Sequence, residues 1–173
     1  MNVDQRCQSI ELILSDVDGV LTDGRLIYDN QGIESKAFHI RDGQGIRLWH
    51  ETGRPFGLIT ARNSRIVRAR AAELKIDILR QGTSDKLAAV KEIVNELGLR
   101  PEQICYLGDD LLDLRALDYV GLGVAVADAC GEAREAADHV TRLDGGRGAV
   151  RETIEMILRA QGRWEETVRN YVA

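Results

Sequence analysis

Short apolar segments alternate with segments of helical periodicity along nearly the whole chain, and this alternation constrains the fold more than any other feature. The most regular helix is predicted over 84–97, where an apolar stripe runs from Leu87 to Leu97, Ser84 can cap the start and Gly98 can end the helix. Strands that alternate with helices build a parallel sheet with helices on both faces. We therefore predict an α/β fold.

The same patterns predict the remaining elements. Strands are expected at 10–15, 25–28, 34–39, 55–60, 76–79, 104–107, 123–126 and 139–141, and helices at 42–52, 64–74, 84–97, 111–117, 132–137 and 149–161. The second and third strands flank a turn at 29–32, so they are expected to form a β-hairpin, an insertion at about 24–39. A chain of 173 residues has the length of one domain, and we expect residues 1–173 to form a single one.

Charge and composition exclude several classes of function. The formal net charge is -5 and no dense block of Lys or Arg occurs, so a nucleic-acid partner is not expected. No apolar stretch approaches the ~20 residues of a membrane span, and the first residues lack the pattern of a signal peptide. Cys7, Cys105 and Cys130 form no close pair, which predicts neither a zinc site nor a disulfide framework. We expect a cytoplasmic protein without a membrane partner.

Polar residues gather at the ends of three predicted strands. Asp16 and Asp18 follow the first strand, Thr60 ends the fourth, and Asp109 and Asp110 follow the sixth. In parallel sheets, ligands bind beyond the carboxyl ends of the strands, so these side chains are expected to meet. Carboxylates so close together repel one another unless a cation lies between them. Oxygen ligands favour a hard divalent cation, and magnesium suits a site that also holds phosphate.

Two other sites for cations or phosphates are excluded. The segment from Asp16 to Gly19 begins like an EF-hand loop, but Val20 stands where a ligand is needed and Leu21 where the loop glycine belongs. There is no Walker A motif. A single Asp after a strand is most often a helix cap or a turn residue, but five acids at two strand ends, with Asp113 included, make that explanation inadequate.

Four motifs resemble those of the haloacid dehalogenase-like (HAD) phosphatases, and they occur in the order of that family. The first motif is DVDGVLT at 16–22, the second is Thr60, the third is Lys86, and the fourth is GDDLLD at 108–113. Further segments resemble the 3-deoxy-D-manno-octulosonate 8-phosphate (KDO 8-phosphate) phosphatases. They are the hairpin, AFHIRDG at 37–43, QG at 81–82, VAVADA at 124–129 and GGRGAVRE at 145–152. The similarity runs from about residue 10 to residue 160.

The resemblance implies a Rossmann-like sheet without a cap domain, a homotetramer and a role in KDO and lipopolysaccharide biosynthesis. The hairpin carries the apolar residues Leu26, Ile27, Ile33, Ala37 and Phe38, and a lone hairpin is marginal in water. The family packs the hairpins of four subunits together, so that a neighbour covers each active site.

The resemblance also implies catalytic roles. Asp16 would attack phosphorus and form an aspartyl-phosphate, since an Asp carboxylate is ionised at neutral pH. Asp18 would protonate the leaving oxygen and then activate water. Mg²⁺ would bind the side chains of Asp16 and Asp109 and the main-chain carbonyl of Asp18. Thr60 would donate a hydrogen bond to the phosphoryl group and Lys86 would supply a positive charge to it.

The remaining acids of the fourth motif, Asp110 and Asp113, are interpreted as supports of the metal ligands. A lysine in the first turn of a helix, as predicted for Lys86, opposes the helix dipole, which favours a functional reason for it. The glycine-rich loop at 145–148 leads into a helix. It either binds an anion through main-chain N–H groups or forms a simple turn.

The implied substrate is a small sugar-acid phosphate, which carries a phosphate and a carboxylate. Arginine suits a carboxylate because its planar fork donates two hydrogen bonds. The family's substrate residues map onto Asp18, His39, Ile40, Arg41, Asp42, Gly43, Arg47, Arg62, Arg70 and Lys86. The chain departs from the family pattern at His39, where the family often has Asn, and at Ala61 and Asn63, where it often has Gly and Lys.

Three alternatives remain at this point. A phosphatase for a nine-carbon acid, such as sialic acid or KDN 9-phosphate, would share the chemistry, but such relatives usually carry an acid at the position of Arg62. A phospho-accepting receiver domain also has an acidic cluster with Thr and Lys, but it lacks the second Asp two residues after the first. A catalytically idle relative is disfavoured because every chemical residue is present.

Overall fold

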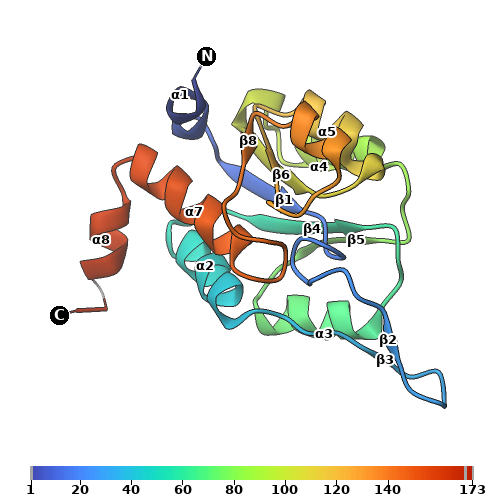
Figure 1. Cartoon of the computed structure of the whole chain (residues 1–173). Helices are drawn as coiled ribbons and strands as arrows, with labels where there is room; N and C mark the ends of the chain where they lie inside the picture. The colour runs from blue at the N-terminus through green and yellow to red at the C-terminus, as the bar shows by residue number, and fades with distance from the viewer. Residues whose placement is uncertain (1, 170, 173) are drawn as a thin grey trace.

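A single six-stranded parallel sheet forms the centre of the molecule (Figure 1). The computed structural model describes residues 2–169 and 171–172. The strand order is β5-β4-β1-β6-β7-β8. The strands are β1 Leu12–Ser15, β4 Phe56–Thr60, β5 Ile78–Gln81, β6 Ile104–Gly108, β7 Leu122–Ala125 and β8 His139–Val140. Every pair of neighbours in this sheet is parallel, which confirms the predicted fold class.

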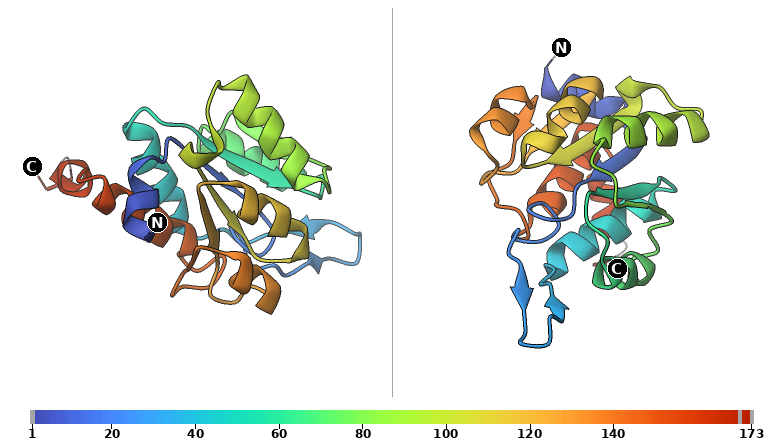
Figure 2. Two further views of the ribbon diagram at one scale, coloured as in Figure 1. Left: turned by 90° about the horizontal axis from the view of Figure 1, so that it is seen from above. Right: turned by 90° about the vertical axis from the view of Figure 1, so that its right-hand side faces the viewer.

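Helices cover both faces of the sheet (Figures 1 and 2). The helices are α1 Val3–Gln8, α2 Ile40–Glu51, α3 Arg65–Glu73, α4 Lys86–Glu96, α5 Leu114–Tyr119, α6 Gly131–Ala136, α7 Ala149–Ala160 and α8 Trp164–Arg169, with short 3-10 turns at Pro101–Gln103 and Leu111–Asp113. Helices α2, α3 and α7 lie on one face, and α4, α5 and α6 lie on the other. Within the described residues, no helix is long and apolar enough to cross a membrane.

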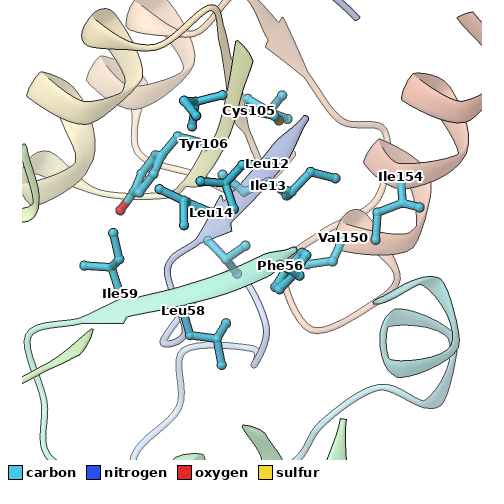
Figure 3. Close-up of a cluster of buried hydrophobic side chains, with 14 of the residues drawn as sticks. Leu12, Ile13, Leu14, Phe56, Leu58, Ile59, Cys105, Tyr106, Val150 and Ile154 are labelled. Carbon is cyan, nitrogen blue, oxygen red and sulfur yellow. The ribbon is translucent and has the colours of Figure 1, made fainter. Parts of the chain in front are cut away.

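The core lies between the central strands and these helices (Figure 3). Every residue of β1 and β6 is buried, as is typical of strands covered on both faces. Phe56 of β4 packs beside Val150 and Ile154 of α7, and Tyr106 of β6 directs its hydroxyl toward the carboxyl end of the sheet.

The direction of the chain across the sheet changes beside β1. The chain runs from β1 outward through β4 to β5, crosses back over the other face by way of α4, and then runs outward again through β6, β7 and β8. In sheets of this kind, loops diverge where the strand order reverses, and ligands bind in the crevice there, which in this chain corresponds to the carboxyl ends of β1 and β6. Asp16 and Asp109 follow these two strands.

The predicted hairpin is present and protrudes from the body of the molecule (Figures 1 and 2). Its strands are β2 Ile27–Tyr28 and β3 Glu34–Ser35, shorter than predicted. Asp29 shapes the turn, because its Oδ1 accepts hydrogen bonds from the N–H groups of Gln31 and Ile33 at 2.8 Å each. Large apolar side chains near the tip are exposed, among them Leu26, Ile27, Tyr28 and Ile33.

Several predicted boundaries are wrong by about two residues. Helix α2 begins at Ile40 rather than at residue 42, because the Nδ1 of His39 accepts a hydrogen bond from the N–H of Arg41 and caps the helix. Helix α4 begins at Lys86, because Asp85, and not Ser84, caps it. Strand β5 lies two residues later than predicted, and the short helices α1 and α8 were not predicted.

Candidate active site

Asp16 stands at the end of β1, in the centre of the crevice. Its N–H donates to the carbonyl of Leu107 at 2.9 Å, so main-chain pairing with β6 continues to this residue. The Nζ of Lys86 lies 3.0 Å from Asp16 Oδ2. Burial raises the pKa of Asp16 to about 6, although the charge of Lys86 opposes this shift. The carboxylate is thus nearly enclosed and has one cation beside it.

Asp18 lies in the same crevice with both carboxylate oxygens hydrogen-bonded. The Oγ1 of Thr60, at the end of β4, donates to Asp18 Oδ2 at 3.3 Å. The Nζ of Lys36, from the hairpin, donates to Asp18 Oδ1. The structure therefore brings Asp18 and Thr60 together as predicted, and it adds a lysine that the sequence did not point to.

Lys86 and Asp113 form a buried ion pair behind Asp16. Lys86 Nζ donates to Asp113 Oδ1 at 2.6 Å, and the hydroxyl of Tyr106 donates to the same oxygen at 2.6 Å. Burial lowers the pKa of Lys86, but the charges of Asp16 and Asp113 outweigh burial, and the net shift is upward. Lys86 therefore remains an ammonium group although its side chain is only 3% exposed.

Asp113 also holds the loop after β6. Its Oδ2 accepts hydrogen bonds from the N–H groups of Asp109 at 3.0 Å and Asp110 at 3.2 Å. These contacts are those of a side chain that holds its neighbours in place, which was the role predicted for Asp113. Asp110 differs from the expectation: its side chain is exposed, and its Oδ1 accepts from the N–H of Leu111 at the start of a 3-10 turn. It stabilises the turn rather than touching the other carboxylates.

The carboxylates of Asp16, Asp109 and Asp113 fit a divalent cation. Each offers an oxygen within 4.8 Å of the others. Among the described residues, Asp109 Oδ1 is buried without a hydrogen-bond partner. Burial, followed by the charges of Asp16 and Asp113, raises the pKa of Asp109 to about 8. Because four donors already occupy Asp113, Asp16 and Asp109 are the side chains available as ligands.

Two further features agree with a cation at this position. Within the described residues, Lys36 pairs with Asp18, and Lys86 pairs with Asp16 and Asp113, but no ion pair joins Asp109 to either lysine. The loop of the first motif also passes close to Asp109, one of the two side chains available as metal ligands. Gly19 has a φ of 103°, and a Cβ there would lie 2.0 Å from Asp109 Oδ2, so only glycine leaves room for that carboxylate.

Arg62 is the one predicted substrate arginine placed beside Asp18 and the hairpin. Its NH2 group donates to the hydroxyl of Tyr28 at 2.7 Å and lies 3.4 Å from Glu34 Oε1. Glu34 Oε2 accepts a further hydrogen bond from the hydroxyl of Ser64 at 2.8 Å. The hairpin is thus fastened to the start of α3 by polar contacts.

Arg70 and Gly43 are brought together, although farther along α3. The guanidinium of Arg70 lies 5.5 Å from the ring centroid of Phe38, and its NH1 donates to Glu73 at 2.8 Å. A Cβ on Gly43 would lie 2.4 Å from the NH2 group of Arg70. Gly43 therefore provides the space in which the arginine lies. In the described part of the chain, the Nε of Arg70 is buried and has no hydrogen-bond partner.

Asp42 differs from its predicted role as a substrate residue. Its side chain is fully buried, and its carboxylate accepts hydrogen bonds from the N–H groups of Gly148 at 3.2 Å and Arg151 at 2.9 Å. Burial raises the pKa of Asp42, and these N–H groups oppose the shift. Because Gly148 has no side chain to cap α7, Asp42 caps that helix from α2.

The other predicted substrate residues face solvent in the isolated chain. Ile40 is 85% exposed, and Arg41 and Arg47 are also exposed. Within residues 2–169 and 171–172, none of their side chains makes a hydrogen bond or ion pair with Asp16 or Asp18. His39 caps α2, as described above. The single chain therefore leaves this part of the predicted substrate site open.

The glycine-rich loop supports the first motif instead of offering free N–H groups. Gly145 donates to Asp128 Oδ1 at 2.8 Å and Gly146 to the carbonyl of Val20 at 2.8 Å, while Asp42 receives the N–H of Gly148. A Cβ on Gly145 would lie 1.7 Å from the carbonyl oxygen of Gly19. Of the two interpretations of this loop, the structure favours the turn.

Sequence reasoning missed Lys36 and its partner Glu34. With Phe38, they occupy alternate positions of the hairpin's second arm, and alternate residues of an extended chain point to one side. This alternation, together with a Lys and a Glu on the inward side, was the available signal. The sequence reasoning also missed Tyr106, which looked like an ordinary residue of a buried strand.

Comparisons with known proteins identify the family of the chain. The model of the haloacid dehalogenase-like hydrolase family matches residues 58–152. The 3-deoxy-D-manno-octulosonate 8-phosphate phosphatase of Yersinia pestis is 47% identical over 164 residues, which are 95% of this chain and 88% of that protein. The enzyme of the same name from Escherichia coli strain K12 is 45% identical over 161 residues, which are 93% of this chain and 86% of that protein.

Solved structures give the same answer for the fold. The crystal structure of the 3-deoxy-D-manno-octulosonate 8-phosphate phosphatase from Moraxella catarrhalis, in complex with magnesium ion, phosphate ion and KDO, has a TM-score of 0.95 to this chain at 39% identity, over 97% of each chain. The cobalt-bound deoxy-D-mannose-octulosonate 8-phosphate phosphatase of Haemophilus influenzae has a TM-score of 0.93 at 39% identity, over 98% of this chain and 100% of that one. The chain therefore belongs to the haloacid dehalogenase-like hydrolase family, in the group that contains the 3-deoxy-D-manno-octulosonate 8-phosphate phosphatases.

Proposed function

We propose that this chain is a magnesium-dependent phosphatase that hydrolyses KDO 8-phosphate to KDO and phosphate. The observation that carries the proposal is the position of Asp16, whose carboxylate lies between Lys86 and Asp109 at the topological switch point of the sheet. The names of the relatives in Yersinia pestis and Escherichia coli supply the substrate. The receiver-domain alternative is not favoured, because the matching family consists of hydrolases.

In the first step, a carboxylate oxygen of Asp16 forms a bond to phosphorus while the bond from phosphorus to the leaving oxygen breaks. Asp18 gives its proton to that oxygen, so the leaving oxygen departs as the neutral hydroxyl group of the sugar acid. In the second step, Asp18 takes a proton from water, and the water oxygen displaces Asp16 from phosphorus. Phosphate is released, and both Asp side chains return to their starting forms.

A bound Mg²⁺, held by Asp16, Asp109 and the main-chain carbonyl of Asp18, would neutralise negative charge shared by the nucleophile and the phosphoryl oxygens. Lys86 is fixed by Asp113 and supplies a positive charge beside Asp16. Thr60 is only 1% exposed, and its hydroxyl, which donates to Asp18 Oδ2 in this structure, would donate to a phosphoryl oxygen once substrate binds.

For the sugar acid, Arg62 is the best-supported ligand of the carboxylate. It lies at the mouth of the crevice, where Tyr28 and Glu34 orient it. Arg70 and Gly43 form a second part of the proposed substrate site, with His39, Ile40, Arg41 and Arg47 beside it. Because Ile40, Arg41 and Arg47 are exposed, we propose that they act next to a neighbouring subunit.

We accordingly propose a homotetramer in which a neighbour covers each active site. The exposed apolar side chains Leu26, Ile27, Tyr28 and Ile33 support a protein contact at the hairpin. We further propose that residues 1–173 act as one hydrolase domain in the cytoplasm, and that the KDO released serves lipopolysaccharide biosynthesis. Cys7, Cys105 and Cys130 are free thiols, which agrees with a reducing compartment.

A substrate panel tests the proposed function. Turnover is measured on KDO 8-phosphate, on sialic acid 9-phosphate and on a sugar phosphate without a carboxylate, with magnesium and with excess chelator. We expect the highest kcat/KM on KDO 8-phosphate, loss of activity on chelation and recovery with magnesium. A preference for the nine-carbon acid, or full activity in chelator, would contradict the proposal.

A further inference from the structure

Lys36 is a buried cation in the active site that comes from the hairpin. Its side chain is only 1% exposed, its Nζ donates to Asp18 Oδ1, and it lies 3.2 Å from Glu34 Oε1. A buried ammonium group is costly unless it is paired and hydrogen-bonded. The position of Lys36 is therefore specified by two carboxylates, one of which is the proposed acid–base group.

Glu34 connects Lys36 to the body of the molecule. Its Oε2 accepts a hydrogen bond from Ser64, the residue that caps α3, and its Oε1 faces both Lys36 and Arg62. Burial alone would raise the pKa of Glu34, but hydrogen bonds from Ser64 and Lys36 and the charge of Lys36 hold it below its usual value. Glu34 is thus an anion that holds the ammonium group of Lys36 over the crevice.

The carboxyl group of Asp18 has one fixed donor on each oxygen. Thr60 donates to Oδ2 from the sheet, and Lys36 donates to Oδ1 from the hairpin. The Thr60 hydroxyl has one proton, which the proposed function assigns to a phosphoryl oxygen when substrate binds. Lys36 is then the donor that still holds the carboxyl group of Asp18. Of these two donors, only Lys36 is charged, and hydrogen bonds from a charged donor are the stronger ones.

We propose that Lys36 is a positioning residue for proton transfer by Asp18, an inference that rests on the proposed function. The charge-assisted hydrogen bond from Lys36 holds Oδ1 of Asp18, so the carboxyl group keeps its orientation while it gives its proton to the leaving oxygen. Lys36 neither gains nor loses a proton. It fixes the orientation of the carboxyl group for the first step and keeps it in place to receive a proton from water in the second.

This role predicts a dependence on the leaving group. A phenol that is a strong acid leaves as its anion without protonation, whereas a weakly acidic phenol or an alcohol needs the proton of Asp18. Lys36→Met keeps the length of the side chain and removes its charge. In excess magnesium, Lys36→Met is expected to lower kcat/KM for phenyl phosphate about tenfold more than kcat/KM for p-nitrophenyl phosphate. This loss is smaller than the roughly 10²–10⁴-fold that general acid catalysis contributes, because Asp18 itself is still present.

Further variants separate positioning from folding. Lys36→Gln, which keeps a donor without the charge, is expected to behave like Lys36→Met, and Lys36→Arg is expected to recover most of the loss. In an Asp18→Asn background, Lys36→Met should change kcat/KM for phenyl phosphate by less than about twofold, because the group it positions has no proton to transfer. Tyr28→Phe loosens the hairpin at Arg62 without touching Lys36, and it should leave the ratio of the two substrates unchanged.

Equal losses on both aryl phosphates would overturn the inference, since they would indicate a structural role alone. So would a full effect of Lys36→Met in the Asp18→Asn background, or a changed substrate ratio in Tyr28→Phe. These outcomes are distinct from failure of the proposed function, in which the wild-type protein would hydrolyse neither phosphate.

Discussion

The ammonium nitrogen of Lys86 lies 3.0 Å from Oδ2 of Asp16, and this contact joins the first residue of α4 to the residue that follows β1. Asp113 holds the same nitrogen from the other side at 2.6 Å. In the proposed mechanism, this lysine fixes the nucleophile and supplies positive charge to the phosphoryl group. Both functions depend on a cation that is almost completely buried.

Replacement of this lysine tests the contact. Lys86→Met leaves Asp16 and Asp113 without their shared cation, and we expect kcat/KM to fall by about 10²–10³-fold, as for the loss of one transition-state donor. In chelator at neutral pH, breaking the buried pair should also lower the free energy of unfolding by about 3 kcal/mol in urea titrations. Lys91→Met, at an exposed position of the same helix, is the matched control. Activity of Lys86→Met within about tenfold of the wild type would contradict the assigned role.

Magnesium should stabilise the protein more at high pH than at low pH. The pKa of Asp109 is about 8 in the folded protein against 3.8 for a free Asp side chain, so the folded state binds more protons between these two pH values. Without metal, this group's stabilising contribution is present below about pH 4 and is lost as the pH rises through about 8. Bound magnesium favours the ionised form of Asp109, so the rise in Tm that magnesium causes should increase between about pH 4 and about pH 8.

The measurement is Tm by calorimetry at about pH 5 and about pH 9, with magnesium and with chelator. Asp109→Asn is the control, because it removes the titrating group, and we expect it to lose most of the magnesium effect at the higher pH. An effect of magnesium on wild-type Tm that is equal at both pH values would show that Asp109 does not bind the ion.

Asp42 should prove structural. Asp42→Ala leaves the N–H groups of Gly148 and Arg151 without their acceptor, and we expect the free energy of unfolding to fall by about 1–3 kcal/mol. Asp42→Asn keeps one acceptor oxygen and should cost less. At a temperature where both variants are folded, KM for KDO 8-phosphate should stay near the wild-type value. Wild-type stability combined with a strongly raised KM would return Asp42 to the substrate site.

Assembly through the hairpin should be sensitive to charge at its tip. Ile27 is 45% exposed in the single chain, and Ile27→Asp should break the proposed tetramer, which light scattering at micromolar concentration reports. Turnover of KDO 8-phosphate should then fall more than turnover of p-nitrophenyl phosphate, since the larger substrate needs the neighbour. Leu97→Asp, at a similarly exposed leucine after α4, is the control. An Ile27→Asp monomer with full activity on the sugar acid would refute the assembly.

Three predicted site residues lie where the sequence placed them, because each position follows from the end of a strand. Asp16, Thr60 and Asp109 each stand where a buried apolar segment stops, and a parallel sheet brings such positions to one edge. The catalytic centre could therefore be assembled without knowing how any loop folds. Asp113 could also be assigned as a support, because it lies in the same motif.

Other residues depend on contacts that no local pattern contains. Lys36 is buried only because the hairpin docks against the crevice. A hairpin that lies in solvent can have the same alternation of residues, so the alternation alone does not show that Lys36 is buried. Asp42 lies on a helix whose pattern does not reveal that it faces the start of α7, which begins more than a hundred residues later. Helices α1 and α8 have six residues each, too few for a periodicity to be recognised.

The most direct test of the account is the turnover of Asp16→Asn on KDO 8-phosphate in saturating magnesium. An amide at this position cannot form the acyl phosphate, so we predict that phosphate release falls by roughly three orders of magnitude or more while the protein stays folded. Wild-type protein measured in parallel should release one phosphate for each KDO formed. Near-normal turnover by Asp16→Asn would contradict the assignment of Asp16 as the nucleophile.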